Sequence, residues 1–156
     1  MYDLVGWQAR LSWNPSKEQQ RQGISKYFTM PGMRKSEHLY NRDLSREHDI
    51  TVIVEGVTDV HRVGPQAVAL FGKVPSTRQT QLFRNVFGHN IGIMLLDSDA
   101  GEEAEEYVKK YSKGLFNGGL HLVRLPEGDP ASHDNDVPRT RQELWDIIIS
   151  QLQGVL

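Results

Sequence analysis

Two stretches decide the fold prediction: TVIVEG at residues 51–56 and IMLLDSD at residues 93–99. Each is a short apolar run that ends in carboxylates, and Asp59 follows the first run closely. Apolar strands of this kind deliver their terminal acids to the edge of a sheet, where ligands bind. Carboxylates gathered there repel one another, so they are stable together only with cations between them. Oxygen-only ligation suits Mg²⁺ or Mn²⁺, and the pair of motifs predicts metal-assisted phosphate chemistry.

The composition excludes several classes of protein. The 156 residues fit one domain with an ordinary core and room for a small appendage. The apolar runs are too short to span a bilayer, and the first residues do not resemble a signal peptide. The chain has no cysteine, which excludes disulfides, zinc ribbons and thiol chemistry within it. We expect no membrane partner and a cytoplasmic location.

The charge is unevenly distributed along the chain. The formal net charge is −2, but residues 1–49 carry about +2 and residues 50–156 about −4. A basic front beside an acidic remainder could hold a polyanion next to a bound metal. The same asymmetry also arises by chance, so it adds little weight alone.

Strand-like and helix-like segments alternate from residue 51 onward. Strands are predicted at 51–55, 67–71, 91–96 and 120–125, and helices at 58–63, between Ser76 and Gly88, at 100–113 and from Thr140. This alternation predicts a parallel, three-layer α/β sheet. Residues 1–49 are irregular and polar, with a strand expected within 5–13 and a short strand or turn at 37–41. They predict a small subdomain or an arm.

Each acidic motif also has a purely structural interpretation. The Asp97-Ser98-Asp99 pair could form a turn and a helix N-cap, and Glu55 could be a solvated strand end. Asp59 could only favour a helix N-terminus, and Asp129 could belong to a simple turn. The remaining polar candidates fit no metal spacing or are expected to be solvated: His61, His89, His121, His133, Asp134 and Asp136.

The motifs together resemble the TOPRIM domain, which bacterial-type primases, topoisomerases and some nucleases share. The resemblance is carried by VIVEGVTD at 52–59, AVALFGK at 67–73, IMLLDSDAGEEA at 93–104 and VRLPEGDP at 123–130. It implies a Rossmann-like parallel sheet of about four strands flanked by helices, with a small irregular N-terminal subdomain. It also implies Mg²⁺ or Mn²⁺, and a set of metal ligands. That set comprises the catalytic acids Glu55, Asp97 and Asp99, joined by Asp59 and Asp129.

The front of the chain resembles the segments that precede TOPRIM in DnaG-type primases. These segments are GWQAR at 6–10, SKYF at 25–28 and KSEHLYN at 35–41. The resemblance implies a primase-like basic segment at 1–49, a TOPRIM domain at 50–130, and a loop and C-terminal helix at 131–156. It also implies a set of residues that bind nucleic acid or nucleotide: Arg10, Lys26, Lys35, Tyr40, Asn41 and Lys73.

The implied function is that of a DNA-directed RNA polymerase of the primase type. Such an enzyme makes short RNA primers on single-stranded DNA from ribonucleoside triphosphates during replication. Family primases carry a Cys-rich zinc module and a longer amino-terminal part, and the family often has an acid at the position of Ala131 and Pro at that of Ser25. These departures imply a fragment or a split phage-type primase, whose partners include a replicative helicase or a separate zinc-binding module. The alternatives are a TOPRIM nuclease or nicking enzyme, and a non-catalytic module that binds single-stranded DNA or a helicase.

Overall fold

A computed structural model describes residues 5–98, 101–126, 128, 130–131 and 140–154. The chain divides into two compact units, Met1–Arg34 and Lys35–Leu156. Each unit is described by itself below. Among the described residues, every helix is too short or too polar to cross a membrane.

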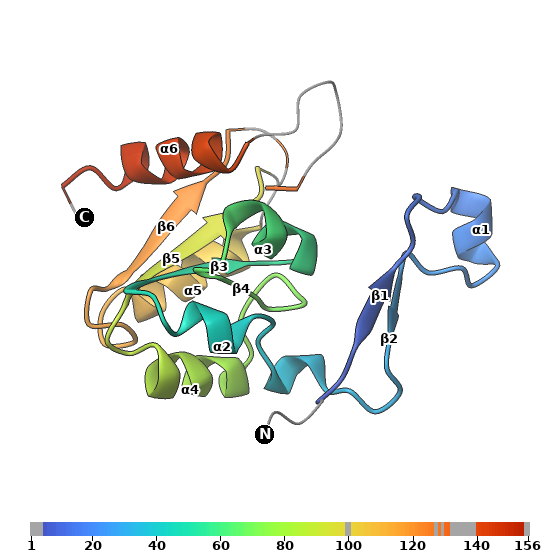
Figure 1. The fold of residues 1–156 in the computed structure, drawn as a ribbon, viewed down its shortest axis with the longest axis horizontal. Coiled ribbons are helices and arrows are strands. Elements are labelled where there is room, and N and C mark those ends of the chain that lie inside the picture. Colours follow the sequence, from blue (N-terminus) through green and yellow to red (C-terminus); the bar gives the residue numbers. More distant parts are fainter. Residues whose placement is uncertain (1–4, 99–100, 127, 129, 132–139, 155–156) are drawn as a thin grey trace. The chain divides into compact units, whose positions relative to one another are not determined.

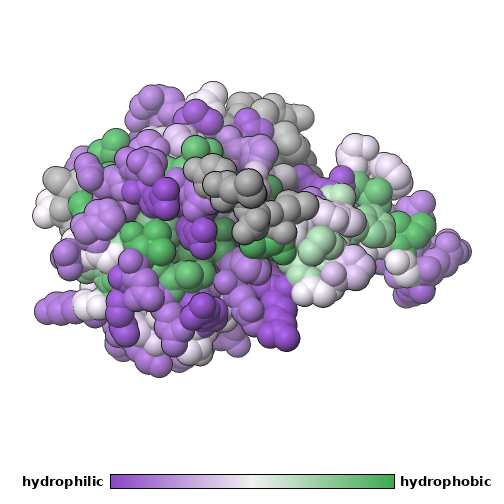
Figure 2. Space-filling view, turned by 60° about the horizontal axis from the view of Figure 1, so that its bottom comes forward, coloured by the Kyte–Doolittle hydropathy of each residue, from purple (hydrophilic) through white to green (hydrophobic). Residues whose placement is uncertain are grey.

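The smaller unit is a two-stranded antiparallel ribbon with one short helix. Strand β1 (Gln8–Arg10) pairs with β2 (Tyr27–Thr29), and α1 (Lys17–Arg21) lies between them in sequence. The strand expected within 5–13 is confirmed as β1, whereas β2 and α1 were not expected because they are too short to show a period. Several large hydrophobic side chains stay exposed on this unit, including Trp7, Trp13 and Phe28, and Figure 2 shows hydrophobic surface there.

The larger unit is built on a four-stranded parallel sheet with the strand order β4-β3-β5-β6 (Figure 1). The fold class predicted from the alternating pattern is therefore confirmed. The strands are β3 (Ile50–Val54), β4 (Ala67–Ala69), β5 (Ile91–Leu96) and β6 (Leu120–Arg124). The helices are the 3₁₀ helix η1 (Lys35–Glu37), α2 (Arg42–Ser45), α3 (Val57–Val63), α4 (Thr77–Val86), α5 (Glu102–Tyr111) and α6 (Arg141–Gln151).

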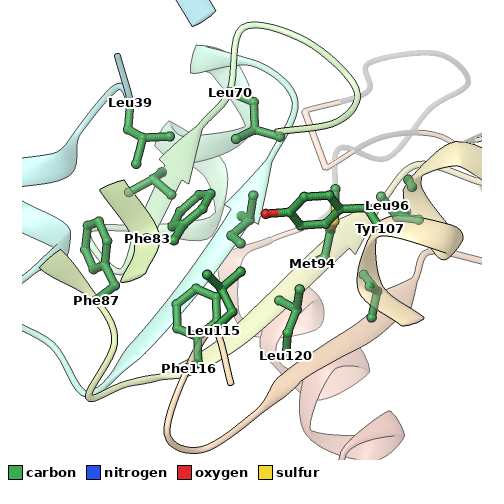
Figure 3. Close-up of a cluster of buried hydrophobic side chains, with 14 residues drawn as sticks. Leu39, Leu70, Phe83, Phe87, Met94, Leu96, Tyr107, Leu115, Phe116 and Leu120 are labelled. Carbon is green, nitrogen blue, oxygen red and sulfur yellow. The ribbon is translucent and has the colours of Figure 1, made fainter. Parts of the chain in front are cut away.

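Alternating strand residues feed two separate cores, one on each face of the sheet. Ile53 and Met94 belong to the first cluster, with Phe83 of α4 and Tyr107 of α5 (Figure 3). Their sequence neighbours point the other way, into a cluster made with α3 and α6. The second cluster contains Val52, Val54, Ile93, Leu95, Val60, Val63, Leu144 and Ile148. Because the central strands are covered on both faces, they are continuously apolar, and this is why the sequence pattern identified them.

One titratable group is buried in the first cluster. The Tyr107 hydroxyl lies 2.9 Å from the Thr80 hydroxyl, and burial raises the pKa of Tyr107 to about 12. Because the pKa of Tyr107 is higher in the folded than in the unfolded protein, its neutral phenol stabilises the fold. This stabilisation is fully present below a pH of about 10, the pKa of tyrosine in the unfolded chain.

We therefore expect alkaline pH to destabilise the protein partly through Tyr107. The free energy of unfolding should fall as the pH rises from about 10 towards about 12, since the unfolded phenol ionises first. Urea unfolding of wild type and Tyr107→Phe across this pH range checks the expectation, and Tyr27→Phe in the exposed ribbon is the matched control. An equally steep loss of stability in Tyr107→Phe would contradict it.

Candidate active site at the carboxyl edge of the sheet

The carboxyl ends of three adjacent strands bring two acids and a lysine to one edge of the sheet. Ile53 is in register with Val68 of β4 and with Met94 of β5, so these parallel strands end at the same side. Glu55 directly follows β3, and Asp97 directly follows β5. Lys73 lies in the segment between β4 and α4.

A pocket of about 430 Å³ opens among these three residues. Its other polar lining comes from Glu102 and Glu103 in the first turn of α5. The remaining wall is apolar or backbone, formed by Ile53, Val54, Leu70, Val74, Met94, Leu95, Leu96, Gly101 and Ala104. The pocket therefore combines four carboxylates and one ammonium group with a lining that is otherwise apolar or backbone.

The turn that carries Asp97 is held from the neighbouring strand. The Ser98 N–H donates to the carbonyl of Gly128 at 2.9 Å, and Arg124 Nη1 donates to the carbonyl of Ser98 at 3.4 Å. Arg124 also pairs with Glu105 on α5. These contacts fix the backbone beside Asp97 between β6 and α5.

Asp59 lies at the start of α3, with its side chain turned towards the helix N-terminus. Its carboxylate accepts a hydrogen bond from the Gly56 N–H at 2.8 Å, and the residue is only 6 % exposed. The described residues that line the pocket do not include it. This hydrogen bond caps α3, which is the structural role that the sequence allows for Asp59. Metal ligation by Asp59 stays a prediction.

We expect Asp59→Ala to lower the free energy of unfolding by about 1–2 kcal/mol. The substitution leaves the Gly56 N–H without its acceptor and removes a favourable charge from the helix N-terminus. Chemical denaturation checks this value, with the exposed Asp146→Ala on α6 as the control. A loss no larger than that of the control would show that the cap is dispensable.

Tyr40 and Asn41 cover the outer edge of β4. The backbone of Tyr40 forms an antiparallel bridge with Ala69, and its hydroxyl lies 3.0 Å from His61 Nε2. The Asn41 amide donates to the carbonyls of Pro65 and Ala67 at 3.0 and 2.9 Å. Both side chains thus already have structural contacts, and their predicted role in nucleotide binding stays a prediction.

The three predicted phosphate-binding residues of the front segment fall in different units. Arg10 and Lys26 belong to the smaller unit, where the Arg10 guanidinium lies 5.7 Å from the centroid of the Tyr27 ring. Lys35 begins the larger unit, in η1. Their joint action on one ligand stays a prediction.

Two of the predicted acids, Asp99 and Asp129, lie outside the described residues. Within the described part of the chain, no group of three or more His, Cys, Asp or Glu side chains could hold a metal ion. The pocket nevertheless fits Mg²⁺, because this ion keeps several waters and takes one or two protein carboxylates together with substrate phosphates. Glu55 and Asp97 provide such a pair in one pocket.

The sequence did not single out every residue near this pocket. Glu102 and Glu103 line the pocket but were not singled out as site residues, because the helix dipole already explains acids in the first turn of a helix. Gln79 was not singled out either, although its buried amide contacts three carbonyls in addition to closing the capping box of α4. A capping box already accounts for a Gln at this position, so no signal in the sequence marked the extra contacts.

A ligand pocket outside the carboxyl ends of parallel strands is the arrangement by which open α/β sheets bind their ligands. The fold is shared with part of DnaG primase catalytic cores. The chain is similar to the RNA polymerase domain of the Mycobacterium tuberculosis primase DnaG in complex with double-stranded DNA. The identity is 24 %, with a TM-score of 0.64 and coverage of 93 % of this chain and 48 % of that one.

Two further solved structures give the same result. The Aquifex aeolicus primase, with zinc-binding and RNA polymerase domains, is 23 % identical, with a TM-score of 0.65 and coverage of 94 % of this chain and 37 % of that one. A DnaG primase catalytic domain bound to single-stranded DNA is 22 % identical, with a TM-score of 0.64 and coverage of 95 % and 48 %. No protein-family model and no curated protein matches the chain. The chain thus spans about half the length or less of these three solved chains.

Proposed function

We propose that the chain is the metal-binding part of a primase catalytic core, which makes short RNA primers on single-stranded DNA. The observation that carries the proposal is the pocket that Glu55, Lys73 and Asp97 share at the carboxyl edge of the sheet. The primase-like fold supports it, and so does the binding of DNA that is described for similar structures.

Three polar residues of the pocket have a role in this proposal. Glu55 and Asp97 would hold Mg²⁺ or Mn²⁺, with Asp99 as the third acid, and Asp59 and Asp129 as further ligands. When bound, the metal neutralises the triphosphate and assists attack by the 3′-hydroxyl of the primer. Lys73 would bind a phosphate oxygen, and the apolar lining of the pocket limits the water that competes for these charges.

The proposal also assigns a role to the residues outside the pocket and to the partners of the chain. Arg10, Lys26 and Lys35 bind phosphates of the template or the primer, and Tyr40 and Asn41 also contribute to the binding of nucleic acid or nucleotide. Residues 1–49 then form the nucleic-acid-binding segment, 50–130 the TOPRIM domain, and 131–156 a supporting loop and helix. A replicative helicase and a separate zinc-binding module act as partners.

Primer synthesis with the purified 156-residue chain tests the proposal. Labelled ribonucleoside triphosphates, single-stranded DNA and Mg²⁺ or Mn²⁺ are combined, and RNA products are separated by size. Nucleotide binding is followed in parallel by calorimetry with and without EDTA, because a chain that needs a partner for synthesis still binds nucleotide on its own.

We expect metal-dependent binding of nucleotide and, with any partner that is required, RNA products. Cleavage of DNA or RNA without nucleotides would favour the TOPRIM nuclease instead. Binding of single-stranded DNA that is unchanged by EDTA, with no binding of nucleotide, would favour a non-catalytic module.

A further inference from the structure

The side-chain amide of Gln79 joins two segments that lie far apart in the sequence. Its Nε2 atom donates to the carbonyls of His38 at 2.8 Å, Leu70 at 2.9 Å and Lys35 at 3.3 Å. An NH₂ group has two hydrogens, so the longest contact shares a hydrogen with another. Gln79 is only 2 % exposed, and a buried amide in such a position is strongly held.

The other end of this amide is also occupied. Gln79 Oε1 accepts from the Ser76 N–H at 3.0 Å, which closes the capping box of α4. The Ser76 hydroxyl in turn donates to the carbonyl of Ser36. Two side chains at the start of α4 therefore fasten η1, a three-residue helix with no buried residue of its own.

Leu70 links Gln79 to the edge of the sheet that carries the acids. The Leu70 N–H donates to the carbonyl of Val54 at 3.1 Å, directly before Glu55. Leu70 also lines the pocket, three residues before Lys73. One amide side chain thus contacts the backbone of Lys35 on one side and the backbone that leads to Lys73 on the other.

We propose that Gln79 is a positioning residue, which holds the backbone of Lys35 in a fixed place relative to the segment that carries Lys73 into the pocket. The inference rests on the proposed function for its ligand, a nucleoside triphosphate. Gln79 itself does not contact the ligand. It fixes the backbone positions from which the Lys35 and Lys73 side chains extend, so that both ammonium groups act on the same phosphates.

Hydrogen exchange tests the coupling without any ligand. Gln79→Met keeps the length of the side chain and removes both donors, and Gln79→Glu keeps the acceptor for Ser76 while removing the donors. Gln81→Met, at an exposed position of the same helix, is the matched control. We expect both Gln79 variants, but not the control, to exchange faster at residues 35–38 and at residues 70–74. Unchanged exchange, or faster exchange in only one segment, would overturn the coupling.

Binding of ATP with Mg²⁺ tests the role towards the ligand. We expect Gln79→Met to weaken binding about 10-fold, as the loss of a supporting contact does at other sites. Lys73→Ala should then weaken binding less in the Gln79→Met background than in wild type. A structural role alone predicts independent effects of the two substitutions, and that result would overturn the inference. A wild-type chain that binds no ATP at all would instead contradict the proposed function, while the exchange experiment would still decide the coupling.

Discussion

Replacing Asp97 with Asn is expected to weaken Mg²⁺-dependent binding of ATP by at least about 100-fold, the upper end of what loss of an outer-shell partner costs at a metal site. Asp97 and Glu55 are the two acids that directly follow central strands of the sheet, and both line the pocket. The amide keeps the shape of the side chain but has no charge, so the site loses one of the oxygens that a hard cation prefers. Glu55→Gln should have a similar effect.

Calorimetric titration of each variant with ATP, in the presence and absence of Mg²⁺, measures this loss. Glu106→Gln is the matched control, because it makes the same change on the exposed face of α5. Its affinity should stay within about twofold of wild type, since screened surface charges contribute little. If Asp97→Asn and Glu106→Gln behaved alike, the pocket would not be the metal site.

The acids at the sheet edge were predictable because the strands before them carry a pattern of their own. Buried parallel strands are continuous apolar runs, so the ends of β3 and β5 could be read directly, together with the acids that follow them. The helices α4 and α6 were expected to begin after Ser76 and Thr140, and the structure contains a capping box at each of these residues. At these helix starts, the local hydrogen bonds of the cap and the burial of the helix face favour the same structure.

The smaller elements could not be read in the same way. Strand β2 has three residues, and its pairing with β1 depends on contacts across about twenty residues of chain. Helix α2 has four residues and begins after Asn41, which adopts a left-handed conformation with φ of 63°. Strand β2 and helix α2 are both too short to show a repeating hydrophobic pattern in the sequence, so only the folded structure reveals them.

The hydrophobic pattern of the sequence also does not predict which contacts a single side chain makes. Asp59 has the spacing both of a ligand and of a helix cap; the distance to the Gly56 N–H shows the cap, and metal ligation stays a prediction. The contacts of Gln79 also cannot be read from spacing, since its hydrogen bonds to Leu70 and His38 depend on how two distant segments pack. Spacing along the chain predicts which residues can meet, whereas burial and distance decide which of them do.

Phe83→Ala is expected to lower the free energy of unfolding by about 3–5 kcal/mol, the usual range for a buried aromatic side chain. Phe83 is 0 % exposed, and its ring centroid lies 6.0 Å from that of Phe87 and 5.7 Å from that of Phe116. Truncation leaves a cavity between α4, the sheet and the segment after α5, because the neighbouring rings are themselves held by the surrounding cluster (Figure 3). The loss would be a large part of the total stability of a domain of this size, which is roughly 5–15 kcal/mol.

Urea denaturation followed by circular dichroism measures the effect, and Phe28→Ala is the control. It is the same chemical change at a side chain that is 44 % exposed, so its free energy of unfolding should stay within about 0.5 kcal/mol of wild type. Phe83→Leu should fall between the two, because a smaller hydrophobic side chain still fills part of the space. Since Gln79 lies one helical turn before Phe83 on α4, a Phe83→Ala variant that remains folded should also exchange faster at residues 35–38. Similar losses in Phe83→Ala and Phe28→Ala would mean that the cluster under α4 is not the main core of the larger unit.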